Sequence, residues 1–262
     1  MDPPWALRIV ALVMCVVIVA RMLGARRGKD YFIRRIPGVD ALEETVGRAT
    51  ETGRPVVFSP GIGAFDNMQT IAGLAVLAWV AKRCVQMGVR IFVPIAEPVV
   101  ISAAGDILHE AFRSEGREEE YRSTDVVFFG RDENAYAAGV IGLLTREQAA
   151  AAYYFGGFGF ESLLMAETGN RVGAIQVGAT ADFFQIPFFL CACDYTLIGE
   201  ELYAASAYLS RDPIQVGAVS GQDFCKAILL SIILAGSIAS TYMMLSGSSP
   251  WTLNPVEGLL GR

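Results

Sequence analysis

The residues best able to do chemistry are glycines and single carboxylates that follow short apolar runs. Gly61 and Gly63 come after the run Val56–Ser59, and Gly157 and Gly159 come after a similar run. Glycine lets a backbone approach a ligand closely, although it also makes ordinary tight turns. The sequence lacks the third glycine of the dinucleotide motif, a Gly-Lys-Ser/Thr phosphate loop and a Gly-x-Ser-x-Gly nucleophile turn. We therefore treat the four glycines as candidate ligand contacts of unspecified chemistry.

Four polar side chains stand at further strand ends and are candidate contacts in the same crevice: Glu97, Thr180, Asp182 and Glu200. Convergent carboxylates would supply a general acid and base or a hard-metal site. The alternative is that acidic residues at helix starts only cap those helices. Apart from Cys191-x-Cys193, no Cys or His pair has metal-ligand spacing, so we expect no metal and no cofactor. No catalytic residue is assigned, and a non-catalytic protein is favoured over an enzyme.

Composition excludes one class of partner. Among 262 residues, 21 Lys and Arg stand against 27 Asp and Glu, giving a net charge of −6. Nucleic-acid binding would need a basic surface, so nucleic acid is not an expected partner. With 53% hydrophobic residues, part of the chain is expected to lie in a membrane.

The apolar runs alternate with segments of helical spacing. Strands are predicted at Val56–Ser59, Arg90–Ile95, Asp125–Phe129, Ala152–Phe155, Ala174–Val177 and Tyr195–Ile198. Helices are predicted at Asn67–Met87, Pro98–Glu115, Glu133–Gln148, Glu161–Thr168 and Glu200–Leu209. This alternation predicts an α/β fold, a Rossmann-like three-layer domain with a mostly parallel sheet over residues 55–210. Segments 58–73 and 155–169 resemble each other, which indicates either an internal half-repeat or the ordinary likeness of two strand-to-helix turns.

Two apolar stretches flank this domain, and each predicts a single transmembrane helix. They are Trp5–Leu23 and Ala227–Leu245, each close to the length that a bilayer requires. We expect an N-terminal helix with a short outer tail at 1–24, a basic juxtamembrane segment with a short helix at 25–54, a linker at 211–225, a second transmembrane helix at 226–246 and an outer tail at 247–262.

Positive charge beside the two stretches predicts their orientation. The inner flanks carry Arg26, Arg27, Lys29, Arg34, Arg35 and Lys226. By the positive-inside rule, the central domain is expected in the cytoplasm at the inner cell membrane, with both termini outside.

Small side chains recur every fourth residue on the second stretch, at Ala227, Ser231, Ala235 and Ala239. Such a face permits close helix packing in lipid, against the first stretch or another copy, although Ala and Ser are also common in membrane helices. The run Phe183–Leu190 is interpreted mainly as core, with an intersubunit or membrane-facing surface as the alternative.

The segments Glu133–Gly139, Phe155–Gly169 and Gly199–Leu209 resemble bacterial membrane proteins that carry domain of unknown function 6754. The likeness runs from about Ile36 to Asp212. The resemblance implies a membrane-tethered domain and no established activity.

Two functions remain open. The favoured hypothesis is a membrane-anchored cytoplasmic α/β domain that acts as a self-associating scaffold or assembly unit. Its partners would be the lipid bilayer, further copies of the chain as a homo-oligomer, and other membrane proteins. The alternative is a membrane-tethered small-molecule sensor or enzyme that uses the glycine-lined crevice at the strand ends.

Overall fold

The computed structural model describes residues 5–29, 31, 37–210 and 213–245, and the chain divides into two compact units. One unit comprises residues 34–210, and the other combines residues 1–33 with 211–262. The two expected outer tails lie largely outside the described residues, as do Arg34 and Arg35 of the expected basic flank.

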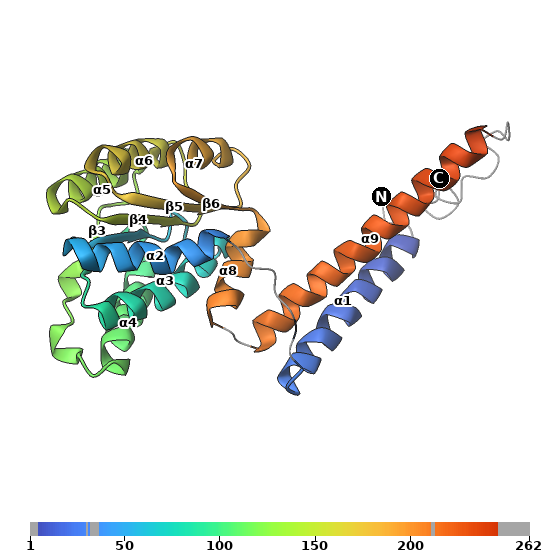
Figure 1. Cartoon of the computed structure of the whole chain (residues 1–262), viewed down its shortest axis with the longest axis horizontal. Helices are drawn as coiled ribbons and strands as arrows, with labels where there is room; N and C mark the ends of the chain where they lie inside the picture. The colour runs from blue at the N-terminus through green and yellow to red at the C-terminus, as the bar shows by residue number, and fades with distance from the viewer. Residues whose placement is uncertain (1–4, 30, 32–36, 211–212, 246–262) are drawn as a thin grey trace. The chain divides into compact units, whose positions relative to one another are not determined.

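A six-stranded, all-parallel sheet forms the centre of the larger unit, in the order β3-β2-β1-β4-β5-β6 (Figure 1). The strands are β1 Val56–Ser59, β2 Ile91–Ile95, β3 Val126–Phe128, β4 Ala151–Phe155, β5 Ile175–Thr180 and β6 Tyr195–Ile198. Every residue of β1, β2 and β4 is buried, which explains their continuous apolar runs, because a parallel sheet is covered on both faces. The α/β prediction is confirmed.

Helices cover both faces of the sheet (Figure 1). One face carries α2 Pro37–Thr52, α3 Met68–Met87, α4 Pro98–Ser114 and α8 Glu200–Ser210. The other carries α5 Glu133–Glu147, α6 Glu161–Val172 and α7 Ile186–Ala192. Two 3-10 turns, Glu118–Glu120 and Ser123–Asp125, lie between α4 and β3. The sequence did not predict α7, a helix of 7 residues that is too short for its spacing to stand out.

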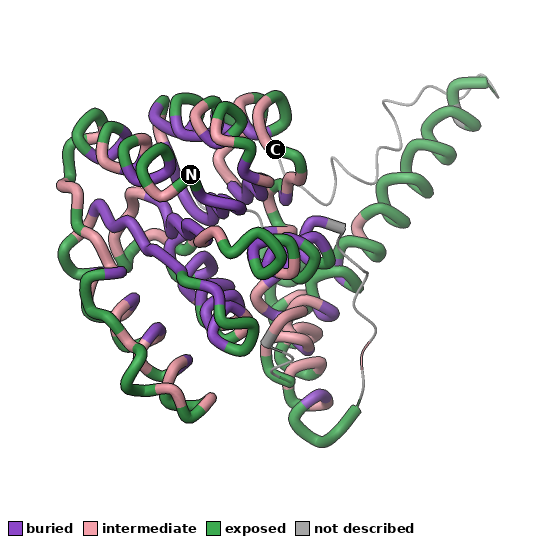
Figure 2. Tube along the Cα trace, turned by 60° about the vertical axis from the view of Figure 1, so that its left-hand side comes forward, coloured by how far each residue is buried: buried purple, intermediate pink, exposed green. Residues whose placement is uncertain are grey.

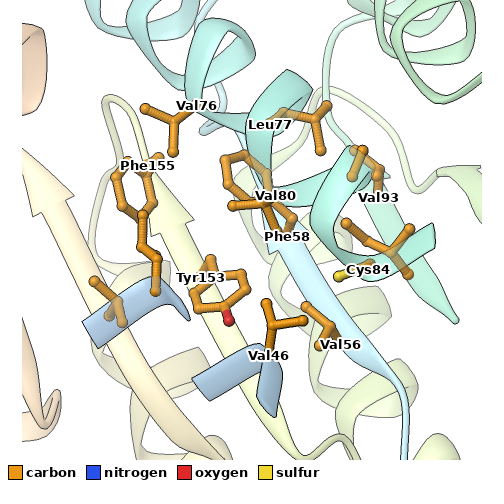
Figure 3. Close-up of a cluster of buried hydrophobic side chains, with 14 of the residues drawn as sticks. Val46, Val56, Phe58, Val76, Leu77, Val80, Cys84, Val93, Tyr153 and Phe155 are labelled. Atoms are coloured by element: carbon orange, nitrogen blue, oxygen red, sulfur yellow. The ribbon is translucent and has the colours of Figure 1, made fainter. Parts of the chain in front are cut away.

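The hydrophobic core between the sheet and α3 is built from aromatic and branched side chains (Figure 3). Phe58 on β1 stacks on Phe155 of β4 with ring centroids 5.5 Å apart, and Val80 of α3 lies beside them. The hydroxyl of Tyr153 shares a 2.5 Å hydrogen bond with Thr45 Oγ1 of α2, so its polar end is satisfied. Figure 2 shows the buried residues concentrated in this sheet and the helix faces that cover it.

The smaller unit is an antiparallel pair of helices, α1 Trp5–Arg26 and α9 Pro213–Leu245. A Cβ built on Gly217 would lie 2.7 Å from Met22 Cα, and one built on Gly221 would lie 2.9 Å from Ile18 Cα. The prediction of a linker at 211–225 is wrong from Pro213 onward, because the chain is helical there. Its two glycines let α9 approach α1 closely, and this packing supports helix where the sequence alone suggested a connection.

Three helices in the described part of the chain are long and apolar enough to cross a membrane. Arg8–Arg26 in α1 and Pro213–Tyr242 in α9 each have 6% of their apolar window buried, whereas Met68–Met87, which is α3, has 56% buried. The apolar character of α3 is explained by its place on the sheet. The exposure of α1 and α9 is consistent with membrane association.

Candidate functional site

The two glycine turns lie beside each other at the carboxyl edge of the sheet, after β1 and β4. The chain leaves β1 toward β2 and leaves β4 toward β5, so the crossovers diverge on either side of this point. In open α/β sheets, such a switch point is the usual ligand position. The structure thus brings Gly61 and Gly157 together at this edge, while their role as contacts in a ligand crevice stays a prediction.

These two turns contact each other through their backbones. The Ile62 amide donates a 3.0 Å hydrogen bond to the Gly157 carbonyl. A Cβ built on Gly61 would lie 2.5 Å from that same oxygen, and the φ of Gly61 is +89°, so a side chain is doubly disfavoured there. A Cβ on Gly156 would lie 2.3 Å from the Pro60 carbonyl oxygen. The missing side chains are therefore explained by contact between the loops without any ligand.

Gln69, near the start of α3, connects the glycine turns to the end of β5. Its Oε1 accepts hydrogen bonds from Thr180 Oγ1 at 3.2 Å and from the Ala181 amide at 2.8 Å. Asn67 caps α3 by accepting from the Gln69 amide at 2.9 Å, and its Nδ2 lies beside Gly63 and Gly157. The sequence reasoning missed both amide side chains. The signal available was an Asn directly before a long helical segment.

The three expected acidic contacts do not converge. Glu97 follows β2 and pairs with Arg131 at 3.1 Å, whereas Asp182 follows β5 and caps the Phe184 amide at 2.9 Å. Glu200 begins α8, after β6. In this strand order β2 and β5 stand three strand spacings apart, about 14 Å, so Glu97 and Asp182 cannot act on one small ligand. No group of three or more His, Cys, Asp or Glu side chains suited to a metal occurs in the described residues.

A different carboxylate pair lies at the same edge of the sheet. Glu133 and Glu161 are the first residues of α5 and α6, and a Cβ built on Gly159 would lie 2.8 Å from Glu133 Oε2 and 2.7 Å from Glu161 Oε2. Burial raises the pKa of Glu161, and the Glu133 charge raises it further, while the hydrogen bond from the Gly159 amide opposes the shift. Only Gly159 of this group was predicted from the sequence.

Behind this pair, a buried hydroxyl chain joins α5 to the sheet. Ser59 Oγ at the end of β1 lies 2.6 Å from the Tyr136 hydroxyl, which also donates to the Pro94 carbonyl at 3.2 Å. Burial raises the pKa of Tyr136, and the Glu161 charge adds to the shift. At neutral pH this phenol is protonated and holds the ends of β1 and β2 together.

Two cavities lie at the opposite, amino edge of the sheet, with volumes of 340 and 310 Å³. Arg90 borders both and is bound to Asp125 through a 2.6 Å ion pair. Arg54 borders the larger cavity, and its guanidinium donates to the carbonyls of Gln148, Ala149 and Val172. Both arginines are engaged in holding elements together.

A family model described as domain of unknown function DUF6754 matches residues 4–249. The chain belongs to this family. The match covers both compact units, so the helix pair and the α/β unit are parts of one family module. No curated protein and no solved structure matches the chain.

The small-residue positions of α9 divide into two groups. Gly217, Gly221 and Cys225 are buried against α1, and the Cys225 thiol lies 3.9 Å from the Met14 carbonyl. The four positions singled out from the sequence are exposed within the chain, namely Ala227, Ser231, Ala235 and Ala239. The described contacts between α1 and α9 therefore use other residues, and packing of the predicted face against another copy stays a prediction.

Proposed function

We propose that this protein is a membrane-anchored α/β domain that assembles with further copies of itself and has a scaffolding rather than a catalytic role. The exposed apolar surfaces of α1 and α9 support the anchor. A single observation carries the proposal of self-association, and it concerns two charged residues on α9.

The register of the helix pair puts Asp223 and Lys226 beside the apolar centre of α1. Gly217 lies against Met22 and Gly221 lies against Ile18. The two helices are antiparallel, so four residues forward along α9 correspond to four residues backward along α1. Asp223 therefore stands level with Val16, and Lys226 stands level with Val13. Their side chains form an ion pair at 4.0 Å and remain 57% and 45% exposed.

With this register, an isolated helix pair exposes either charged side chains to lipid or apolar side chains to water, at either position of the bilayer along the helices. If lipid surrounds α1, Asp223 and Lys226 enter it as a pair, which is unfavourable, although it costs less than twice the about 2.5–3.5 kcal/mol of one charge at a helix centre. If lipid surrounds only the charge-free part of α9 after Lys226, then the exposed Val16, Val19 and Leu23 of α1 face water. A second copy that covers this face would relieve either conflict, because charged residues in membranes usually face a protein interior.

Further surfaces suit the same assembly. The small-residue face of α9, defined by Ala227, Ser231, Ala235 and Ala239, is open within the chain and would allow close helix approach. In the larger unit, Phe183 and Phe184 are 81% and 79% exposed on the loop after β5. Paired aromatic rings with this exposure are typical of contact surfaces.

The proposal includes a membrane topology for the two helices. We place α1 and α9 as two membrane spans, with the α/β unit in the cytoplasm and both termini outside. Arg26, Arg27 and Lys29 at the end of α1 support this orientation by the positive-inside rule. Lys226 does not add to that cluster, because it stands level with Val13 and not with Arg26.

The second candidate function is ligand binding at the switch point. The strand order β3-β2-β1-β4-β5-β6 is that of Rossmann-like dinucleotide-binding domains, which favours a Rossmann-like assignment and a ligand there. The backbone contact between the two glycine turns argues against a phosphate at this point, since the Gly157 carbonyl already lies against Gly61 and the Ile62 amide. A thermal-shift series with nucleotides and sugars on the full chain tests this candidate, because a ligand of the folded state raises the melting temperature.

The mass of the full chain in mild detergent tests the scaffold. We expect a wild-type particle of more than one chain, and a lower assembly state for Ala235→Leu or Ala239→Leu, because a larger side chain separates the helices. Ile233→Leu is the matched control, since Ile233 is exposed on the same helix outside that face and the change keeps its volume. A wild-type monomer would refute self-association, and unchanged assembly in both alanine variants would remove the α9 face from the interface.

A further inference from the structure

Two helix N-termini meet at the carboxyl edge of the sheet, and each begins with a glutamate. Glu133 begins α5 and Glu161 begins α6, and these helices pack side by side on the same face. Both carboxylates border the same point beside Gly159, at 2.8 and 2.7 Å from where its Cβ would be. Because Gly159 has no side chain, no atom of this residue separates them.

Glu161 is the unusual member of the pair, because its side chain is 0% exposed. One carboxylate oxygen, Oε1, accepts a 2.7 Å hydrogen bond from the Gly159 amide. The other, Oε2, is buried without a hydrogen-bond partner in the described structure. A buried charged oxygen without a partner is strongly unfavourable, so Oε2 calls for a positively charged or proton-donating group at this point.

The nearest cation along the chain, Arg131, is already paired. Arg131 stands just before α5 and binds Glu97 at 3.1 Å. Both glutamates also lie where the partial positive charge of a helix N-terminus favours the ionised carboxylate. Glu133 is partly exposed, so the pair borders solvent on the Glu133 side.

We propose that Glu133 and Glu161 together bind a divalent metal ion, and that Mg²⁺ is the ion best suited to the site. Mg²⁺ in proteins is commonly held by one or two carboxylates while it keeps several water molecules. Glu161 Oε2 supplies the buried ligand, and Glu133 Oε2 supplies the one at the solvent boundary. The inference is independent of self-association, since it concerns only the α/β unit.

A proton would compete for the same oxygen. Acid pH is therefore expected to weaken metal binding, because a carboxylate must be deprotonated to bind a metal ion. The Tyr136 hydroxyl already bonds to Ser59 and the Pro94 carbonyl and is not needed as a ligand. The sequence contained no signal for this pair, because its two members come from separate helices.

Thermal unfolding of the full chain in detergent tests the site, with MgCl₂, MnCl₂ or CaCl₂ added at constant ionic strength. We expect a saturable rise in the melting temperature of about 5 °C or more at 100 times the dissociation constant, largest for Mg²⁺ or Mn²⁺ at neutral pH. Glu133→Gln and Glu161→Gln should abolish the rise. Glu167→Gln is the matched control, since Glu167 is an exposed glutamate of α6 paired with Arg171.

The glutamine variants also separate a metal site from a folding defect. Without divalent ions, Glu161→Gln should melt no lower than wild type, because the amide can still accept from the Gly159 amide and carries no charge. A wild-type chain that none of the three ions stabilises would overturn the proposal, as would a rise that persists in both glutamine variants. A rise that is also lost in Glu167→Gln would overturn it as well, by pointing to diffuse charge screening.

Discussion

Replacing Gly73 by alanine should destabilise the protein, although alanine is normally the better helix residue. Gly73 lies inside α3, where a Cβ would be 2.2 Å from the Phe155 carbonyl oxygen at the end of β4 and 3.5 Å from Pro60 Cα. Both are backbone atoms of elements fixed in the sheet and its glycine turn. Helix α3 would therefore have to move outward by more than 1 Å to reach an ordinary contact of about 3.4 Å.

The expected magnitude follows from two opposing effects. Alanine gains about 1 kcal/mol of helix propensity over glycine. Overpacking a rigid site costs about 1–3 kcal/mol, and more where backbone must move. The strain should exceed the gain, so we expect a net loss of about 1–2 kcal/mol, or about 2–8 °C in melting temperature for a unit of this size.

Gly142→Ala provides the matched control, and thermal unfolding of the detergent-solubilised chain provides the assay. Gly142 is an exposed residue inside α5 with nothing within 4 Å of its would-be Cβ, so the same substitution should there raise the melting temperature by about 2–4 °C. If Gly73→Ala is as stable as Gly142→Ala, α3 does not approach β4 as described. The glycines of this edge would then have a role other than close packing.

Three further substitutions probe other parts of the structure. Arg54→Met removes the guanidinium that donates hydrogen bonds to carbonyls at the ends of α5 and α6. We expect urea titration to show a free energy of unfolding lower by about 1–2 kcal/mol. An unchanged midpoint would mean that these hydrogen bonds contribute nothing to stability. In metal-free buffer, Glu161→Gln should be more stable than wild type near neutral pH and lose that advantage as pH falls to the ordinary glutamate range; a pH-independent difference would contradict this. The reason is that burial raises the pKa of Glu161 in the folded protein, so its ionised carboxylate destabilises the folded state at neutral pH. This destabilisation disappears once the carboxyl is protonated in both the folded and the unfolded chain. Gly221→Leu should separate α9 from α1 and lower the melting temperature of the chain more than Ala227→Leu, which lies outside their contact.

The α/β fold could be predicted from the sequence because a buried parallel sheet leaves a simple pattern. The strand β1 coincides with the predicted Val56–Ser59, and β6 with Tyr195–Ile198. The prediction stopped β5 at Val177, whereas the strand continues to Thr180. Gly178 made the end of this strand resemble a turn, and only the packed ring of Phe189 beside it shows why a glycine belongs inside the strand.

The candidate site was only partly predictable, since a ligand position depends on which strands are neighbours. In a parallel sheet, at least one helix lies in the sequence between any two strand ends that carry the acidic candidates. Their spacing along the chain therefore does not reveal the distance between their side chains. The structure puts Glu97 and Asp182 on different halves of the sheet. It brings together Glu133 and Glu161, which resembled ordinary first-turn carboxylates because each stands where a helix dipole favours one.

The helix pair shows why hydropathy finds candidate membrane spans more easily than it finds their boundaries. Average apolar character does not distinguish a helix covered by lipid from one covered by a sheet, so α3 meets the same criterion as α1 and α9. Nor does it give the register between two helices. That register is set by Gly217 and Gly221, which lie in what hydropathy treats as a polar connection. Because these glycines fix α1 against the charged part of α9, the ion pair of Asp223 and Lys226 cannot leave the apolar level of α1 without breaking the helix contact. The proposed assembly with a second copy would satisfy both constraints at once.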